Sequence, residues 1–327
     1  MQSFTISRPG TLDAATAATA APDRAFIAGG TDLLQLMKQE VARPTRLVDL
    51  DGLLPDAVEV RPDGVRIGAL ALMANVAAHP EVQRNYRAVS EALLSAASPQ
   101  IRNMGTIGGN LLQRTRCNYF RDPGFAACNK REPGSGCAAI RGENRLLGVL
   151  GTSRACIATH PSDLPVALAA LDASLELRGP NGARRTVALA DFYRLPGDTP
   201  HIETALQPGE VIVAVLVPAS AGARRSCYVK LRDRASFEFA LVSCAAAVDL
   251  QRATIREARL ALGGVAPKPW RLPQVEAALQ GRPADAGTFA DAAMHASEGA
   301  QPASQNGFKV KLIQRAVLRA LETTAAA

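Results

Sequence analysis

Four cysteines and two glycine-rich turns are the residues of this chain whose types and spacing could do chemistry. Cys117, Cys128, Cys137 and Cys156 lie in a segment rich in Gly, Arg and Asn, directly after the turn at residues 106–110. Thiolates bind zinc and iron–sulfur clusters. A turn built of small residues lets backbone N–H groups approach a phosphate. The combination indicates two cofactors side by side, and it favours electron transfer over hydrolysis or binding alone.

The spacing of the four cysteines favours one metal type over others. Ten residues separate the first pair, eight the second and eighteen the third, so the segment holds no Cys-x-x-Cys pair. That absence disfavours a zinc ribbon or finger, and the run typical of bacterial ferredoxins is missing too. Widely spaced thiols fit a [4Fe–4S] cluster held by an irregular loop. Zinc and unliganded cysteines stay open as alternatives at this point.

The first glycine-rich turn, at residues 28–33, reads Ala-Gly-Gly-Thr-Asp-Leu and joins a predicted strand to a predicted helix. Backbone N–H groups at such a junction, together with the helix dipole, can bind a pyrophosphate. The turn lacks the G-x-G-x-x-G pattern of dinucleotide-binding doubly wound sheets, and alone it could be a simple turn. With the second turn at 106–110, however, it could grip opposite sides of one long ligand.

Two polar residues further along the chain have both a structural and a functional interpretation. Asp163 lies with Ser162 at the start of a predicted helix, where these residue types are favoured as N-caps. It could instead accept hydrogen bonds from ribose or ribityl hydroxyl groups. Lys230, on a predicted strand, is either a solvated strand residue or a cation that neutralises a reduced flavin. Cys227 and Cys244 lie among apolar neighbours and are expected to be small core residues.

Composition and charge limit the class of protein. The 327 residues suffice for two domains, and with 47% apolar but only 4% aromatic residues the core must consist of Ala, Leu, Val and Ile. Of the net charge of +7, the segment 114–154 supplies +5, from eight basic and three acidic residues. A nucleic-acid binder would carry a basic stripe over its fold. Here the excess surrounds the cysteines, where it would favour thiolates, or it forms a solvated basic loop.

The chain gives no sign of membrane insertion or secretion. No run approaches the roughly 18–20 apolar residues that span a bilayer, and the N-terminus lacks the pattern of a signal peptide. Six cysteines in a chain of this length make a poor secreted disulfide framework. We therefore expect folding in a reducing cytoplasm. Export of a folded complex on a partner's signal would place the protein in the periplasm and leave no trace in this sequence.

The periodicity predicts an α+β chain of two domains. In the first domain, residues 4–49 are expected to form strand, helix, strand, helix, strand. The further elements expected there are a strand at 65–69, helices at 72–78 and 82–97, the irregular cysteine segment at 112–157, a helix at 161–171 with Pro161 in its first turn, and strands at 174–178, 186–188 and 210–217.

The second domain is expected after a linker-like Pro/Ala/Gly-rich break at 218–223. Strands at 227–231, 240–250 and 256–263, the last two paired as a hairpin, precede helices at 274–279, 288–295 and 309–321. This order predicts an antiparallel sheet with helices on one face.

Several motifs together resemble one known family. The most specific is Ile-Arg-Asn-x-Gly-Thr-Ile-Gly-Gly-Asn at 101–110, and it is joined by the 28–33 turn, Ser-Asp-Leu at 162–164, Ala-Ala-Leu-Asp-Ala at 169–173 and Tyr-Val-Lys at 228–230. Over nearly its whole length the chain resembles the FAD-binding subunit of the molybdenum hydroxylases, the family of xanthine dehydrogenase and aldehyde oxidoreductase. The resemblance implies a PCMH-type, two-lobed FAD-binding domain over 1–220 and a CO dehydrogenase flavoprotein-like C-terminal domain over 221–327.

The resemblance also implies roles for individual residues. Asp163 would contact the hydroxyl-bearing part of FAD, and Lys230 would lie near the flavin. The residues implied to hold the FAD phosphates and adjoining groups are Phe26, Ile27, Ala28, Gly29, Gly30, Thr31, Asp32, Leu33, Thr106, Gly109 and Asn110.

The cysteine segment separates this chain from typical family members, which run straight from the Gly-Gly-Asn loop to the helix after residue 162. It is similar to the insert of a subgroup whose flavin subunit carries an extra [4Fe–4S] cluster, here held by the four cysteines of 117–156. Within that subgroup it most resembles periplasmic-type aldehyde oxidoreductase heterotrimers. The 4-hydroxybenzoyl-CoA reductase branch matches less closely.

The activity implied is electron transfer within a heterotrimer. A molybdenum-cofactor large subunit would oxidise an aldehyde, and a [2Fe–2S] small subunit would pass the electrons to FAD in this chain and on to an external acceptor. No catalytic acid/base residue is expected in this chain. A xanthine- or purine-oxidising trimer is the rival within this family, because the substrate pocket lies in the partner. Outside the family, the rivals are a metal-stabilised binding protein without flavin and a self-sufficient flavin oxidase.

Overall fold

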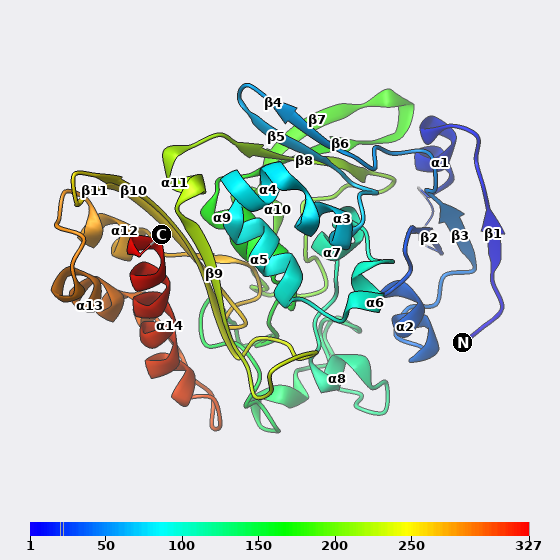
Figure 1. Ribbon diagram of the computed structural model, residues 1–327. Helices are drawn as coiled ribbons and strands as arrows, with labels where there is room; N and C mark the ends of the chain where they lie inside the picture. Colours follow the sequence, from blue (N-terminus) through cyan, green and yellow to red (C-terminus); the bar gives the residue numbers. More distant parts are fainter. Residues whose placement is uncertain (20, 22, 327) are drawn as a thin grey trace.

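The computed structural model describes residues 1–19, 21 and 23–326 and contains three sheets (Figure 1). The first is a small parallel sheet in the order β1-β3-β2, with helices α1 and α2 in the two crossovers. Parallel neighbours need such crossovers, and here each contains one short helix. The predicted strand, helix, strand, helix, strand order is thus confirmed. The elements are β1 (Thr5–Ser7), α1 (Leu12–Ala18), β2 (Arg24–Ile27), α2 (Leu33–Lys38) and β3 (Arg46–Asp49).

The second sheet is antiparallel, in the order β4-β5-β8-β6-β7. Its edge strand β4 is not predicted from the sequence, although the four residues alternate apolar and polar as Val-Glu-Val-Arg; the alternation is short and none of the four is fully buried. The strands are β4 (Val58–Arg61), β5 (Gly64–Gly68), β6 (Ser174–Arg178), β7 (Arg184–Ala188) and β8 (Val211–Pro218).

The helices of the first domain differ from the prediction at two places. The helix expected over 82–97 is two helices, because Tyr86 leaves the helical conformation at φ −138° and ψ 47°. The helix expected from Pro161 begins only at Leu164, and Pro165 occupies its first turn instead. The helices are α3 (Met73–Ala78), α4 (Pro80–Asn85), α5 (Arg87–Ser95), α6 (Pro99–Arg102), α7 (Ile107–Leu111), α8 (Asn118–Arg121), α9 (Leu164–Ala170) and α10 (Leu189–Phe192).

The third sheet, antiparallel in the order β12-β11-β10-β9, belongs to the C-terminal part. The predicted hairpin of the two long strands is confirmed. The expected linker at 218–223 holds the end of β8 and the start of the short helix α11. The elements are α11 (Ala221–Arg224), β9 (Ser226–Leu231), β10 (Val242–Gln251), β11 (Thr254–Gly263), β12 (Trp270–Arg271), α12 (Pro273–Leu279), α13 (Ala286–Met294) and α14 (Phe308–Ala325).

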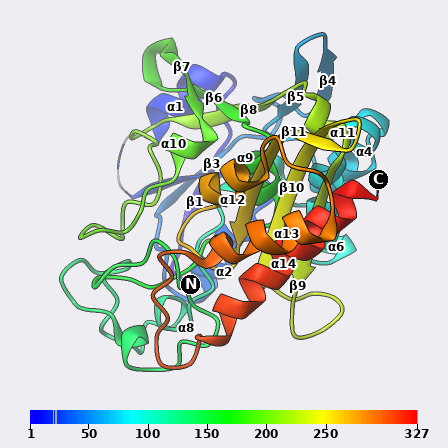
Figure 2. The same ribbon diagram turned by 90° about the vertical axis from the view of Figure 1, so that its left-hand side faces the viewer.

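Both faces of this third sheet are buried, and this joins the two parts of the chain. Successive strand residues point to opposite faces. Cys244 and Ala246 of β10 belong to the core that includes residues of α12–α14, whereas Ala245 and Ala247 belong to the core of the first domain, with α5 and α9. Figure 2 shows α12, α13 and α14 in front of the sheet. Cys227 and Cys244 are 1% and 0% exposed, so the prediction that they are core residues is confirmed.

The cysteine segment at 112–157 is irregular, as predicted, apart from α8 and a short 3-10 turn at Ala138–Ile140. Its C-terminal part is fixed to the C-terminal part of the chain by buried polar side chains. Asn306 donates to the carbonyls of Leu147 and Gly148, and the Lys309 ammonium donates to those of Leu146 and Leu147. Across residues 1–19, 21 and 23–326, no helix is both long and apolar enough to cross a membrane.

Candidate functional site

The two glycine-rich turns meet in space, although they lie far apart in the sequence. A Cβ atom added to Gly29 would come within 1.9 Å of the backbone oxygen of Met104, so only glycine fits at this crossing. Gly30 has a φ of +67°, a conformation that residues with a side chain rarely adopt. The tertiary fold therefore places the 28–33 turn directly against the segment that leads into the 106–110 turn.

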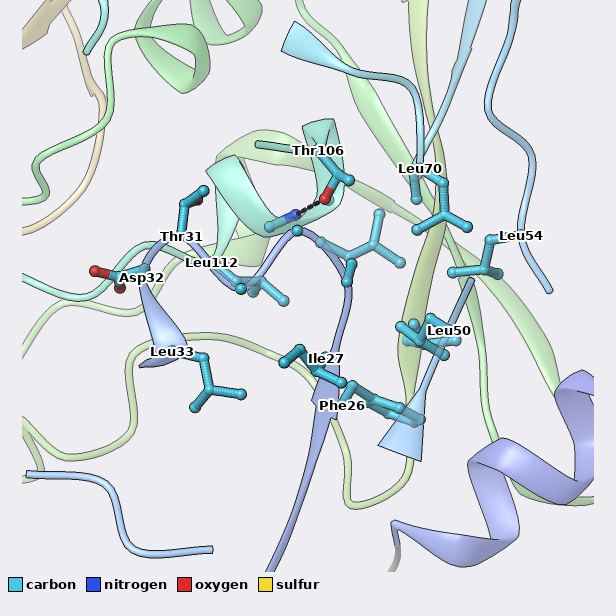
Figure 3. A pocket seen from close by; sticks show the side chains of 18 of the residues that line it. Phe26, Ile27, Thr31, Asp32, Leu33, Leu50, Leu54, Leu70, Thr106 and Leu112 are labelled. Atoms are coloured by element: carbon cyan, nitrogen blue, oxygen red, sulfur yellow. Dashed lines mark hydrogen bonds between the residues drawn. The ribbon is translucent and has the colours of Figure 1, made fainter. Parts of the chain in front are cut away.

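A first cavity of about 330 Å³ lies beside these turns. All residues from Phe26 to Leu33 line it, together with Thr106 and Gly109. Figure 3 shows Leu50, Leu54 and Leu70 as an apolar wall on the side away from Asp32. The Thr106 hydroxyl oxygen accepts a hydrogen bond from the Gly109 N–H at 3.2 Å, which leaves its own hydrogen free to donate to a ligand.

A second cavity of about 220 Å³ adjoins the first. Asn110, Asp163 and Lys230 line it, as do residues of the 234–239 loop. Thr31, Asp32 and Gly109 line both cavities. A long ligand can therefore pass over the turn residues, with one end in each cavity.

Asp163 and Lys230 form a buried ion pair, and neither is a solvated residue. The Lys230 Nζ atom lies 2.8 Å from Asp163 Oδ2, and the side chains of Lys230 and Asp163 are 4% and 5% exposed. Lys230 also donates to the carbonyl of Ser95, and the Tyr228 hydroxyl donates to Asp163 Oδ1. Burial, with the Asp163 carboxylate adding to it, raises the pKa of Tyr228 well above its ordinary value, so the phenol stays neutral.

Asp163 stands at the N-cap position of α9, but its side chain makes no capping hydrogen bond. The simple N-cap interpretation is therefore wrong. Each carboxylate oxygen can accept more than one hydrogen bond. Asp163 thus orients Lys230 and Tyr228, and it keeps capacity for a hydroxyl group that enters the second cavity.

Asn110 connects the second turn to the start of α9. Its Oδ1 atom lies 2.5 Å from the Ser162 hydroxyl, which donates to it, and its Nδ2 faces the sulfur of Met73 at 3.4 Å. The side chain is buried within the fold. Asn110 therefore holds residues 162 and 163 against α7.

Asp32 faces the cysteine segment. The guanidinium groups of Arg116 and Arg121 each place a nitrogen 2.8 Å from Asp32 Oδ1, and the backbone N–H of Arg114 donates to Oδ2. These arginines are not among the site residues predicted from the sequence. The basic excess of the segment was the signal that could have indicated them, but their partner could not be identified from spacing.

The four cysteines, free thiols in the structure, lie in one apolar cluster together with Phe120. Cys117, Cys128 and Cys156 are buried, whereas Cys137 is partly exposed and pairs through its backbone with Cys128. Burial raises the pKa of the Cys117 thiol to about 12. Within the described part of the chain, no three His, Cys, Asp or Glu side chains already form the site of a single metal ion.

The basic residues of the segment mostly pair with carboxylates, which corrects the expectation that they surround thiolates. Lys130 and Arg114 bind Glu203, and Arg145 binds Asp233. Lys130 also acts on a thiol: burial raises the pKa of Cys156, and the Lys130 ammonium partly offsets that rise. The basic excess is therefore chiefly a set of ion pairs that fix the segment to the rest of the fold.

Comparisons with known proteins agree with this geometry. Residues 2–220 match the family model described as "FAD binding domain in molybdopterin dehydrogenase", and residues 226–324 match "CO dehydrogenase flavoprotein C-terminal domain". The chain is 50% identical to the aldehyde oxidoreductase FAD-binding subunit PaoB of Escherichia coli over 98% of both chains. It is 28% identical to the glyceraldehyde dehydrogenase medium chain of Sulfolobus acidocaldarius, over 86% of this chain and 82% of that one.

A solved structure is also similar. A chain of carbon monoxide dehydrogenase from Hydrogenophaga pseudoflava superimposes with a TM-score of 0.76 at 28% identity, covering 99% of this chain and 98% of that one. The mixed helix-and-sheet fold expected from the sequence is thereby confirmed. This chain belongs to the family of FAD-binding subunits of the molybdopterin dehydrogenases.

Proposed function

We propose that this chain is the FAD-carrying electron-transfer subunit of a molybdenum-dependent aldehyde oxidoreductase. The observation that carries the proposal is the pair of joined cavities over the two glycine-rich turns. The chain that contains them is 50% identical to an aldehyde oxidoreductase subunit. We further propose that residues 1–220 form the FAD-binding domain, with 112–157 as its iron–sulfur insert, and that 221–327 form the second domain. The two family matches, at 2–220 and 226–324, support this division.

The residues present fit FAD. Gly29 lets the two turns pack against each other, and the small residues Gly30 and Gly109 then line the first cavity, where the backbone can approach the pyrophosphate of a dinucleotide closely. In the proposal, the pyrophosphate lies over Thr31 and Gly109, the adenosine part enters the first cavity and the ring system enters the second, near Lys230. Asp163 would then accept hydrogen bonds from the hydroxyl-bearing part. FAD supplies one- and two-electron transfer, while the protein binds and orients it.

The four cysteines are proposed to hold a [4Fe–4S] cluster. Their gathering in one buried cluster supports this, although residues 117 and 156 are far apart in the sequence. Each thiolate of such a cluster binds a different iron, so the four sulfurs need not converge on one point. A metal would replace the protons that burial otherwise keeps on the thiols of Cys117 and Cys156. Zinc is the competing occupant, and metal analysis distinguishes the two.

The partners are proposed to be a molybdenum-cofactor large subunit and a [2Fe–2S] small subunit. A relative is itself named a medium chain, which indicates larger and smaller companions in that enzyme. We propose that the chain folds in the cytoplasm and reaches the periplasm only within an exported complex.

The test is to co-express the chain with the products of neighbouring genes, purify the complex anaerobically, and measure FAD, iron, sulfide and zinc per chain. We expect bound FAD, together with iron and sulfide that fall by about four each in a Cys128→Ser variant. A Cys227→Ser variant is the matched control, because Cys227 lies in a different core. If the preparation contains flavin but no iron in this chain, the FAD proposal stands and the [4Fe–4S] proposal is refuted. A preparation without flavin would overturn the proposed function.

A further inference from the structure

Asp32 is the one acidic side chain of the 28–33 turn, and its position calls for an explanation other than phosphate binding. It lines both cavities. A carboxylate beside a pyrophosphate would repel it, because both groups are negative. Figure 3 shows the Asp32 carboxylate pointing away from the apolar wall of the first cavity. Its charge is instead met by donors from the cysteine segment.

These donors use both carboxylate oxygens. Arg116 and Arg121 each approach Oδ1 at 2.8 Å, and the Arg114 N–H donates to Oδ2 at 2.9 Å. The side chain of Arg121 is 8% exposed and that of Asp32 is 13% exposed, so water screens this contact little. Arg121 also donates from Nε to the Thr115 carbonyl and from Nη2 to that of Arg114. We call Asp32, Arg116 and Arg121 the Asp32 clamp.

The clamp connects the turn to the cysteine cluster through one short helix. Cys117 is the N-cap residue of α8, and Arg121 is the last residue of that helix. Phe120 of the same helix lies in the cysteine cluster. Arg131, between Cys128 and Cys137 in the sequence, donates to the carbonyls of Tyr119 and Phe120. Order around the cysteines therefore fixes α8, and α8 fixes the guanidinium that binds Asp32.

Arg121 differs from Arg116 in one useful respect. Arg116 lines the second cavity, where it could touch a ligand. Arg121 is not among the residues that line either cavity in the described part of the chain. Any effect of Arg121 on ligand binding must therefore pass through its contacts, which are Asp32 of the turn and the carbonyls of Arg114 and Thr115.

We propose that Asp32 and Arg121 are positioning residues through which the cysteine insert holds the 28–33 turn in its dinucleotide-binding form, so that an ordered insert slows the release of FAD. This inference rests on the proposed FAD site and extends it. Where the slower release reflects tighter equilibrium binding, reciprocity requires that FAD bound at the turn stabilise the insert by the same coupling free energy.

The experiment compares full-length variants by two measurements. The first is the rate of FAD release on dilution into a large excess of buffer, followed by flavin fluorescence. The second is amide hydrogen exchange of peptides covering residues 28–36 in the flavin-free chain, which requires no bound FAD. The variants are Arg121→Gln, Asp32→Asn, their double variant and Arg121→Lys. Arg141→Gln is the control, since Arg141 is an exposed arginine of the same segment with no ion pair among residues 1–19, 21 and 23–326.

We expect Arg121→Gln and Asp32→Asn each to speed FAD release by about tenfold or more, as for loss of a shielded charge-assisted hydrogen bond. The double variant should release FAD less fast than the two single effects combined would give, because both single variants remove the contact between Asp32 and Arg121. Arg121→Lys should release FAD more slowly than Arg121→Gln, because it keeps the positive charge. Arg141→Gln should release FAD at the wild-type rate. Amide hydrogen exchange at residues 28–36 should be faster in Arg121→Gln and in Asp32→Asn than in the wild-type chain.

Unchanged exchange at 28–36 in Arg121→Gln would overturn the clamp, and so would additive effects of the two single variants. A wild-type chain that never binds FAD would instead overturn the proposed function. In that case the exchange measurement still decides whether the insert holds the turn.

Discussion

The buried pair of Asp163 and Lys230 gives the most quantitative prediction. In a Lys230→Met variant the apolar stem is kept, but the ammonium 2.8 Å from Asp163 is lost. The carboxylate then stays buried, with Tyr228 as its remaining donor in the described structure. The free energy of unfolding should fall as a result.

The size of the effect follows from the burial of both partners. Removing one partner of a buried ion pair costs about 3–5 kcal/mol, because the other charge is left uncompensated. The side chains are 4% and 5% exposed, so no large discount for solvent screening applies. The Tyr228 hydroxyl still solvates the carboxylate, and a charge-assisted hydrogen bond contributes roughly 1.5–3 kcal/mol. We therefore expect a loss near the lower limit, about 3 kcal/mol.

The assay is urea unfolding of the flavin-free chain, followed by circular dichroism and compared at equal m-values. An Asp163→Asn/Lys230→Met double variant should recover part of the loss, since no unpaired charge remains buried. Lys311→Met is the control: Lys311 is exposed on α14, and its replacement should change stability by no more than about 0.5 kcal/mol. If Lys230→Met costs less than about 1 kcal/mol, or the double variant is no better than the single one, the pair is not the buried electrostatic contact described above.

Two further predictions concern the glycine crossing and His160, a partly buried histidine whose Nε2 atom is shielded from solvent. Gly29→Ala places a Cβ against the Met104 oxygen and should abolish FAD retention, whereas Gly10→Ala, with open space around it, should not; flavin per chain after gel filtration checks both. Burial lowers the pKa of His160 to about 4 from its ordinary 6.5. Between these two pH values the His160 imidazole stays neutral in the folded state, whereas in the unfolded chain it binds a proton. Stability should therefore fall from pH 6.5 to pH 4, by up to roughly 3 kcal/mol from this group. Urea midpoints across that range should fall less steeply in His160→Gln, and equal slopes would contradict the burial of a neutral imidazole.

Local sequence patterns predict most of the secondary structure, and they fail where local signals conflict or are weak. Strand β4 escapes prediction because its Val-Glu-Val-Arg alternation spans only four residues, the shortest run that indicates a strand. The predicted start of α9 falls too early, because a proline at 161 suits a first turn as well as Pro165 does. The break at Tyr86 also has no local signal strong enough to interrupt the apolar spacing of α4 and α5.

The sequence by itself determined the chemistry available to this protein. It supplied two turns without bulky side chains, four thiols in an irregular segment, and a family resemblance that the comparisons confirm for the FAD-binding domain. These are properties of residue type and local spacing, which the chain carries wherever it folds. The central residues of the proposed FAD site, from Phe26 to Leu33, could therefore be named in advance.

Only the tertiary structure decided which groups meet. It set Gly29 against Met104, paired Lys230 with Asp163, and brought Asp32 of the first turn to Arg121 of the cysteine segment. Such contacts join residues separated by tens of positions. They depend on how whole sheets and helices pack, and no local pattern encodes which carboxylate a given cation will reach.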